Sequence, residues 1–464
     1  MSSPPNSNGK SLAVSMSGGG HRATLFVLGA LMYLVDAKAN TYVTSIASVS
    51  GGSLTNGFVG QNLNFRETDG DEFRSRVASP LATQIANKGT LFAPLFSKFY
   101  LFILFVTGLL ALAIPAIVSV PWYVRILFFL IGLTVWGWVL ALRGRVCARA
   151  FNTTLFSPNG RGTKLAEIKK HNLDHVICST EFRSAEQVYF GGDFVYSYAL
   201  GHGVPAELSL ARAVQSSAAF PGGFPPATLS TKQHKFTGAP PPSAGGPPEP
   251  PSNMVLTDGG VYDNMGEQWA RGYAARIKLC PNLGQGRTPP NQLVVVNASA
   301  RFPWIPFRRR LLPLVGELAA LLRVNDVLYI NTTNVRRQAI VDSYNPLDPT
   351  KASALPSVLV QIAQSPFVVA NAFAKETGPV ADRAKEVLEF LNGGPTSEQW
   401  KQIASDNANV GTSLNKFGSE VTARLIYQGY VVTMCNLHVF FPDFVLRPEE
   451  LSIDRFRALI LSKR

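Results

Sequence analysis

The sequence predicts an α/β protein with a mostly parallel sheet, interrupted by a pair of long apolar helices. Short β-branched and aliphatic runs are followed by glycine-containing turns and then by residues at helical spacing. Three of these turns carry residues suited to chemistry, at residues 18–20, 50 and 258. Two neighbouring stretches, 99–124 and 126–142, contain no charged residue, and a membrane span needs about 20 apolar residues.

The composition favours a membrane component. The chain has 464 residues, enough for two or three domains or for one domain with insertions. Only 16% of the residues are charged, which is low for a soluble protein. The net charge of +13 suits an anionic lipid surface or nucleic acid, but no run of five Lys or Arg residues occurs, so we expect no nucleic-acid partner.

Cysteine spacing and the N-terminal residues bear on the compartment. The four cysteines are far apart and form neither a disulfide framework nor a zinc pattern, which fits a reducing compartment. No metal is expected, and no calcium-loop pattern occurs. Residues 1–9 are polar, so no signal peptide is expected.

The first turn lies between a strand expected at Leu12–Met16 and a helix expected at Thr24–Lys38. It carries Gly18, Gly19 and Gly20, and free N–H groups at a helix start form a site for negative charge. A phosphate cradle would require Lys followed by Ser or Thr after the glycines, where this chain has His-Arg-Ala. The alternatives are an oxyanion hole, with a cation such as Arg22 nearby, or a plain tight turn.

The second turn has the features of a nucleophile elbow. A strand expected at Thr41–Ser45 leads to Ser50, and a helix is expected from Leu54 to Gly60. Ser48 and Gly52 stand where the G-x-S-x-G pattern has its two glycines, so Ser48 replaces the first. Taken alone, the stretch also fits a structural Gly/Ser turn.

The uncharged stretches 99–124 and 126–142 predict a helical hairpin, with aromatic anchors next to Pro121 at its tip. Lys98 precedes the pair, and three arginines follow it at positions 143, 145 and 149. Positive charge at both ends places both ends on the cytoplasmic side. Two alternatives stay open: a hairpin that enters one leaflet only, turned early by prolines, and a buried helix pair in a soluble core.

The third turn begins at Asp258, after a strand expected at Asn253–Thr257. Open α/β sheets place ligands at the carboxyl ends of their strands. The segment 238–252 is rich in Pro and Gly and predicts a flexible loop, and 301–310 mixes aromatic and basic residues, which fits a lipid headgroup interface or a solvated loop. Further strands are expected at 175–180 and 293–297, and helices at 208–217, 265–275, 380–391 and 451–461.

Together, these motifs resemble the patatin-like phospholipases, also called patatin-like lipid acyl hydrolases. The resemblance depends on residues 18–22, 48–52 and 258–260, in the family's order, and on 216–221, and it extends from about Leu12 to Asn297. It implies a three-layer α/β/α core. It also implies a Ser50–Asp258 dyad, an oxyanion hole at Gly18 to Gly20, no cofactor, and hydrolysis of acyl lipids through an acyl-enzyme. His21 falls at a variable position of the family's loop, and Arg22 would support the loop or meet a lipid phosphate.

The expected organisation is a catalytic core divided by the hairpin. Residues 1–98 form the first part of the core, 99–142 the hairpin, 143–344 the remainder and 345–464 a mostly helical extension. The expected partners are membrane lipids, as substrate, and an anionic membrane surface. The alternatives are an inactive membrane scaffold or lipid-binding protein, and a transacylase. The sequence indicates neither the organelle nor the oligomeric state.

Overall fold

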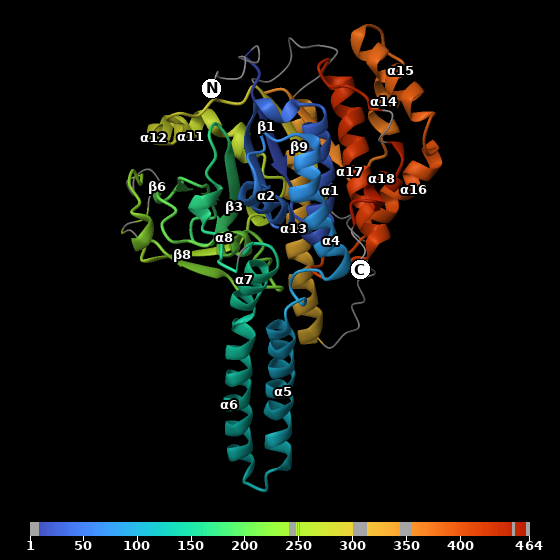
Figure 1. Ribbon diagram of the computed structural model, residues 1–464. Coiled ribbons are helices and arrows are strands. Elements are labelled where there is room, and N and C mark those ends of the chain that lie inside the picture. The colour runs from blue at the N-terminus through green and yellow to red at the C-terminus, as the bar shows by residue number, and fades with distance from the viewer. Residues whose placement is uncertain are drawn as a thin grey trace.

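A computed structural model describes residues 9–158, 160–240, 247, 249, 251–299, 313–343, 355–447 and 451–460. The basic and aromatic segment at 301–310 and most of the Pro-rich segment 238–252 lie outside these residues. Figure 1 shows a core of strands and helices from which two long helices, α5 and α6, project together.

The sheet is mixed, and its central strands are parallel. The order is β10-β9-β1-β2-β3-β4-β5-β6, and β8 pairs with β3 and β7. The parallel strands are β10 (Ser357–Gln361), β9 (Gln292–Asn297), β1 (Leu12–Met16), β2 (Val43–Val49) and β3 (Asp174–Glu181). The antiparallel strands are β4 (Gln187–Phe190), β5 (Val195–Ser197), β6 (Gly201–Gly203), β7 (Ala227–Ser230) and β8 (Asn253–Asp258).

Helices cover both faces of this sheet, which confirms the predicted α/β/α fold. Val14 and Met16 of β1 pack into a core shared with α1 (Gly20–Asp36), α2 (Gly51–Asn62) and α17 (Ser419–Phe440). Ala13, the residue before Val14, packs on the opposite face with Met265 and Ile340. This alternation follows from the two-residue period of a strand.

The remaining helices surround these layers. Their bounds are α3 (Gly70–Phe73), α4 (Ser79–Asn87), α7 (Arg143–Thr154), α8 (Leu210–Ser217), α9 (Gly260–Asp263), α10 (Gln268–Arg271), α11 (Tyr273–Leu279), α12 (Pro281–Gly284), α13 (Pro313–Asp342), α14 (Phe367–Phe373), α15 (Pro379–Leu391), α16 (Ser397–Ala408) and α18 (Asp454–Arg457). The region predicted as a helical extension therefore also contributes β10 to the sheet edge and α17 to the core.

Glycines allow α1 and α17 to cross at close range. A methyl group on Gly29 would lie 2.0 Å from the carbonyl oxygen of Ile426, and one on Gly429 would lie 2.0 Å from that of Phe26. The two backbones therefore touch where each helix has no side chain, and this crossing holds the C-terminal region against the N-terminal part of the chain.

We expect Gly29→Ala to lower the free energy of unfolding by about 3 kcal/mol, the upper end of the usual cost of overpacking. Urea unfolding of the purified protein measures the effect. Gly411→Ala is the control, because a methyl group there meets open space. Equal stability of the two variants would contradict the close crossing.

The predicted hairpin consists of α5 (Leu95–Ile117) and α6 (Trp122–Ala141), both long and apolar enough to cross a membrane. Their side chains are exposed or half-buried, since only Ser97 and Ala111 are buried in α5 and none in α6. This exposure argues against the buried helix pair. Helix α5 also continues through Pro115, so this proline does not turn the chain early.

Other local predictions differ from the structure in informative ways. Thr41 and Tyr42 belong to a 3₁₀ turn (Ala39–Tyr42), and β2 begins only at Val43 and continues to Val49. The helix expected at 265–275 is replaced by the short helices α10 and α11, which are separated at Gly272. Gly266, with a positive φ of 70°, lies before both of them. Among the described residues of the helix expected at 451–461, which end at 460, only the short α18 forms.

Candidate active site

The turn after β2 has the geometry of a nucleophile elbow. Ser50 has φ 48° and ψ −113°, a conformation that is strained for a residue with a side chain. Its two following glycines allow tight packing, since a methyl group on Gly51 would lie 2.1 Å from Gly20 O and one on Gly52 would lie 2.8 Å from Ser17 O. The backbone therefore holds the Ser50 side chain in a fixed direction between β2 and α2.

Ser48, which stands where the pattern has glycine, is a buried hydrogen-bonding residue. Its hydroxyl donates to Val176 O at 3.0 Å and accepts from Asn56 Nδ2 at 2.9 Å and from Ser53 Oγ at 3.1 Å. The positive φ of the turn lies at Ser50 and not at Ser48. The departure from the pattern therefore adds hydrogen bonds beneath the elbow.

Replacing Ser48 with the glycine of the pattern is expected to lower the free energy of unfolding. Ser48→Gly removes three buried hydrogen bonds and adds backbone freedom to the unfolded chain, so we expect a loss of about 2–4 kcal/mol in the free energy of unfolding. Urea unfolding measures it, with Ser75→Gly on the surface as a control. A variant as stable as the wild type would show that Ser48 is only a tolerated replacement.

Asp258 ends β8 and faces the elbow. Gly260 N donates to Asp258 Oδ1 at 2.8 Å. Burial raises the pKa of Asp258 to about 7, although this hydrogen bond and the neighbouring Ser50 side chain act in the opposite direction. A carboxylate with this pKa can accept and return a proton near neutral pH.

The glycine loop lies beside this pair. Gly18 N donates to Asn264 O at 3.0 Å, whereas the N–H groups of Gly19 and Gly20 have no acceptor among the described residues. A methyl group on Gly18 would lie 3.2 Å from Ser50 Cβ and 2.6 Å from Asn264 Oδ1. Gly18 thus provides space next to the serine, and the free donors are at Gly19 and Gly20, where α1 begins.

Arg22 and His21 are buried and hold this loop in place. Arg22 Nε donates to Ala298 O at 2.9 Å, a second guanidinium nitrogen donates to Val410 O, and burial lowers its pKa to about 10. The contacts of Arg22 favour loop support over a lipid phosphate. His21 contacts Asn415 O at 2.8 Å and Thr90 Oγ1 at 2.9 Å, and burial lowers its pKa to about 4. His21 therefore has a local role.

Three further residues contact the site. Ser217 Oγ accepts from Ser50 N at 2.9 Å, Asn264 bonds to Gly18, and the Tyr329 hydroxyl donates to Asn264 Oδ1. Ser217 lies in the segment 216–221 on which the resemblance partly depended, and Asn264 follows Asp258 by six positions. Tyr329 lies on α13, for which the sequence analysis predicted no element.

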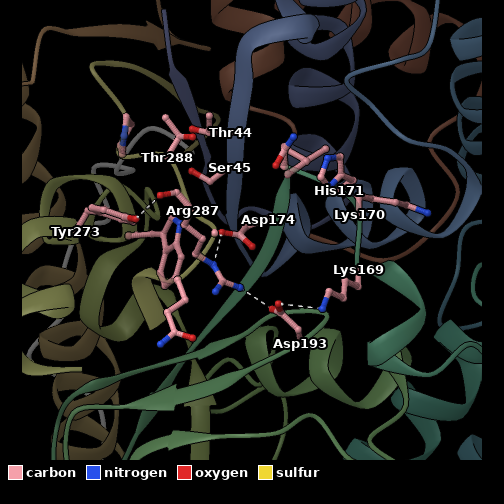
Figure 2. A pocket seen from close by; sticks show the side chains of 16 residues that line it. Thr44, Ser45, Lys169, Lys170, His171, Asp174, Asp193, Tyr273, Arg287 and Thr288 are labelled. Carbon is pink, nitrogen blue, oxygen red and sulfur yellow. Dashed lines mark hydrogen bonds and ion pairs between the residues drawn. The ribbon is translucent and has the colours of Figure 1, made fainter. Parts of the chain in front are cut away.

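A cavity of about 470 Å³ lies at the opposite edge of the sheet, where β2 and β3 begin. Arg287 bridges Asp174 at 2.8 Å and Asp193 at 2.5 Å within it, as Figure 2 shows. The residues that line it include none of those predicted for the active site. Burial also raises the pKa of Asp174 in this cavity, but Asp174 is paired with Arg287. We assign the chemistry to the Ser50 edge because a strained serine elbow there lies beside a buried carboxyl whose pKa is raised to about 7.

The fold and the site define an α/β protein with a strand–turn–helix serine elbow facing an aspartate. The family model described as patatin-like phospholipase matches residues 14–268, which is more than half of the chain. The chain belongs to the patatin-like phospholipase family, which confirms the resemblance stated from its motifs.

Two solved structures are similar to this chain at low identity. The human GIVD cytosolic phospholipase A2 is 12% identical with a TM-score of 0.46, and the match covers 92% of this chain and 59% of that one. VipD from Legionella pneumophila is 14% identical with a TM-score of 0.27, and the match covers 90% of this chain and 66% of that one. No curated protein matches the chain.

Proposed function

We propose that the protein is a membrane-bound lipid acyl hydrolase that cleaves carboxylic esters of glycerophospholipids or related acyl lipids. The observation that carries this proposal is the Ser50 hydroxyl on a strained elbow, beside a buried carboxyl whose pKa is raised to about 7. Membership of the patatin-like phospholipase family supports a lipid substrate.

The first half of the reaction acylates the enzyme. Ser50 Oγ attacks the ester carbonyl carbon while its proton passes to Asp258. The N–H groups of Gly19 and Gly20 donate to the oxyanion that forms, which is stabilised because these donors are already fixed in position. The C–O bond to the glycerol then breaks, and the leaving oxygen takes the proton from Asp258.

The second half releases the fatty acid. Water attacks the acyl-enzyme carbonyl, its proton passes to Asp258, and the bond to Ser50 Oγ breaks as the serine recovers that proton. The products are a lysolipid and a fatty acid. Neither step draws on a metal, a cofactor or a histidine.

The hairpin would hold this site against its substrate. Arg143, at the start of α7, donates from Nε to Gly223 O at 2.8 Å, and Ala219 O, in the same loop, accepts from Asp258 N at 3.1 Å. One loop therefore hydrogen-bonds both to Arg143, where the hairpin joins the core, and to Asp258, the proposed proton acceptor. A lipid in the anchoring membrane would meet the site at high effective concentration. Lys98 and Arg143 at this base suit the anionic cytoplasmic leaflet.

A fluorophosphonate probe and lipid product analysis test the proposal together. The wild type, reconstituted in bilayers, should be labelled and should release fatty acid, and Ser50→Ala should do neither. Absence of labelling in the wild type would favour the inactive scaffold. Acyl transfer to an added acceptor lipid, with no free fatty acid, would instead indicate a transacylase.

A further inference from the structure

Helix α13 runs along the catalytic edge of the sheet and beyond it. Ile340, near its C-terminal end, packs with Ala13 and Leu293, which lie where β1 and β9 begin. Tyr329, eleven residues earlier, lies at the loops that follow the ends of these strands. The residues before Tyr329 therefore project past the sheet on the side of Ser50, over about 24 Å of helix.

The inner face of α13 places a side chain against the dyad. The Tyr329 hydroxyl would lie 2.5 Å from a methyl group on Gly260 and 3.6 Å from one on Gly18, so it lies between the loops that carry Asp258 and the oxyanion glycines. It donates to Asn264 Oδ1, and its ring meets Phe220 edge-on with centroids 6.5 Å apart. A lipid carbonyl approaching Ser50 would compete for this space.

A second contact holds the helix one to two turns further on. Arg336 Nη1 donates to Glu267 Oε1 at 2.9 Å, and its guanidinium lies over the Tyr262 ring at 5.1 Å. Tyr329 and Arg336 thus both bond to the segment that follows Asp258, on the same helix whose Ile340 packs against the sheet.

The exposed side of α13 carries an apolar stripe. Leu321, Val324 and Leu328 are 68%, 53% and 59% exposed, and their spacing of three and four residues places them on one stripe of the helix. A water-exposed helix normally has the reverse arrangement, with its apolar side inward. The stripe therefore requires a partner that is itself apolar.

The position of the hairpin identifies that partner. The base of α6 and α7 packs on the loop 220–225, through Arg143 to Gly223 and Gly144 to Pro225, and Phe220 of this loop contacts Tyr329. In Figure 1 the first turns of α13 extend from the core in the same direction as α5 and α6. The stripe and the hairpin thus lie on the same side of the molecule.

We propose that α13 docks on the bilayer surface through Leu321, Val324 and Leu328, and that Tyr329 keeps the catalytic crevice closed until this docking occurs. Closure of the crevice has a meaning only if Ser50 hydrolyses lipids, so this part rests on the proposed function. Docking itself can be measured without any catalytic activity.

The experiment that tests docking is possible because the native cysteines are buried. All four are buried, so a single exposed cysteine can be labelled selectively with the polarity-sensitive dye NBD in the folded, full-length protein. In vesicles of phosphatidylcholine and phosphatidylserine, dye on Val324→Cys should shift to shorter emission wavelength and be quenched by spin-labelled lipid. Dye on Val341→Cys, which is equally exposed at 55% at the other end of the helix, should do neither.

The outcomes of this arm are distinct. Emission at position 324 like that in water overturns docking. A blue shift without quenching by lipid also overturns it, because a second copy or another protein would then cover the stripe. The measurement gives the same answer in a Ser50→Ala background, so a failed proposal for catalysis leaves it interpretable.

The closure arm uses a soluble short-chain ester with protein in detergent. Tyr329→Phe removes the hydrogen bond to Asn264 and keeps the ring, so the rate should rise about fivefold, the factor that corresponds to one net hydrogen bond. Fluorophosphonate labelling should become faster to the same extent. A lower rate in this variant, with Ser50 still labelled, overturns closure. If neither protein is labelled, the proposed function fails, whatever the dye reports.

Discussion

Asp258→Asn is expected to lower ester hydrolysis by about 10⁴-fold, the size of effect that follows removal of a residue orienting or assisting a serine nucleophile. An amide cannot take the proton of Ser50. It can still accept the hydrogen bond that Gly260 N gives to Asp258 Oδ1 at 2.8 Å, so the loop should keep its shape. The loss should therefore be in kcat, measured on phospholipid vesicles, and Asp193→Asn in the opposite cavity is the control.

The pH profile of the wild type tests the same group. Because burial raises the pKa of Asp258 to about 7, half of the enzyme would hold a protonated, inactive base at that pH. We expect kcat/KM to rise about tenfold per pH unit below 7 and to level off above it. A rate that does not change between pH 5 and 8 would contradict Asp258 as the base.

Asp258→Asn should also stabilise the protein at pH 8. The folded-state pKa of Asp258, about 7, lies above its ordinary value of 3.8, so the folded chain binds the proton more tightly than the unfolded chain. The stability from this group is complete below pH 3.8 and is lost as the pH rises to about 7. At pH 8 the wild type then carries a penalty of about 4 kcal/mol that the asparagine avoids.

Urea unfolding at pH 5 and pH 8 separates this effect from a general change in packing. The gain in stability of Asp258→Asn over the wild type should be about 1.7 kcal/mol at pH 5 and about 4 kcal/mol, near its maximum, at pH 8. A gain of the same size at both pH values would show that the pKa of Asp258 is not raised in the folded protein.

The parts of the fold that the sequence predicts are those with a local signal. Buried strands such as β1 and β9 are short, mostly apolar runs, and the glycines at 18–20 and 51–52 occur where neighbouring atoms leave no room for a side chain. The uncharged segment that forms α5 and α6 is recognisable from composition alone. These features are fixed within a few residues of chain, so no knowledge of the tertiary structure is required.

The parts that the sequence does not predict depend on distant partners. Strand β6 is only Gly201–Gly203 and β7 alternates buried and exposed residues, so neither has an apolar run, and both exist because a neighbouring strand pairs with them. Helix α13 has exposed apolar residues and an inward-facing Tyr329, so its sequence lacks the usual pattern in which the apolar side of a helix is buried. Nor does any local pattern connect Tyr329 to Asn264, 65 positions away.

Arginine substitutions in the middle of both hairpin helices are expected to release the protein from membranes. Phe105 and Ile131 lie near the centres of α5 and α6, and both are exposed on the helix surface. Replacing each with Arg costs about 3–4 kcal/mol of insertion free energy at the bilayer centre, so the pair costs about 6–8 kcal/mol. This corresponds to a fall of at least about 10⁴-fold in the insertion equilibrium.

Carbonate extraction measures this loss, because it strips peripheral proteins and leaves spanning helices in the membrane pellet. The wild type should stay in the pellet, and Phe105→Arg/Ile131→Arg should move to the supernatant. The control variant, Val204→Arg/Leu279→Arg, replaces two exposed apolar residues outside the hairpin and should remain in the pellet. Retention of the hairpin variant would mean that other surfaces hold the protein there.

The same variant separates anchoring from catalysis. Helix α5 has 23 residues and is continuous, about 34 Å long, and α6 has 20, about 30 Å, so both match a hydrocarbon core of about 30 Å. The substitutions lie outside the core that carries Ser50 and Asp258, so hydrolysis of a soluble ester should persist while hydrolysis of vesicle phospholipid falls. Equal loss of both activities would mean that the hairpin supports the fold of the site and does more than bring it to its lipid.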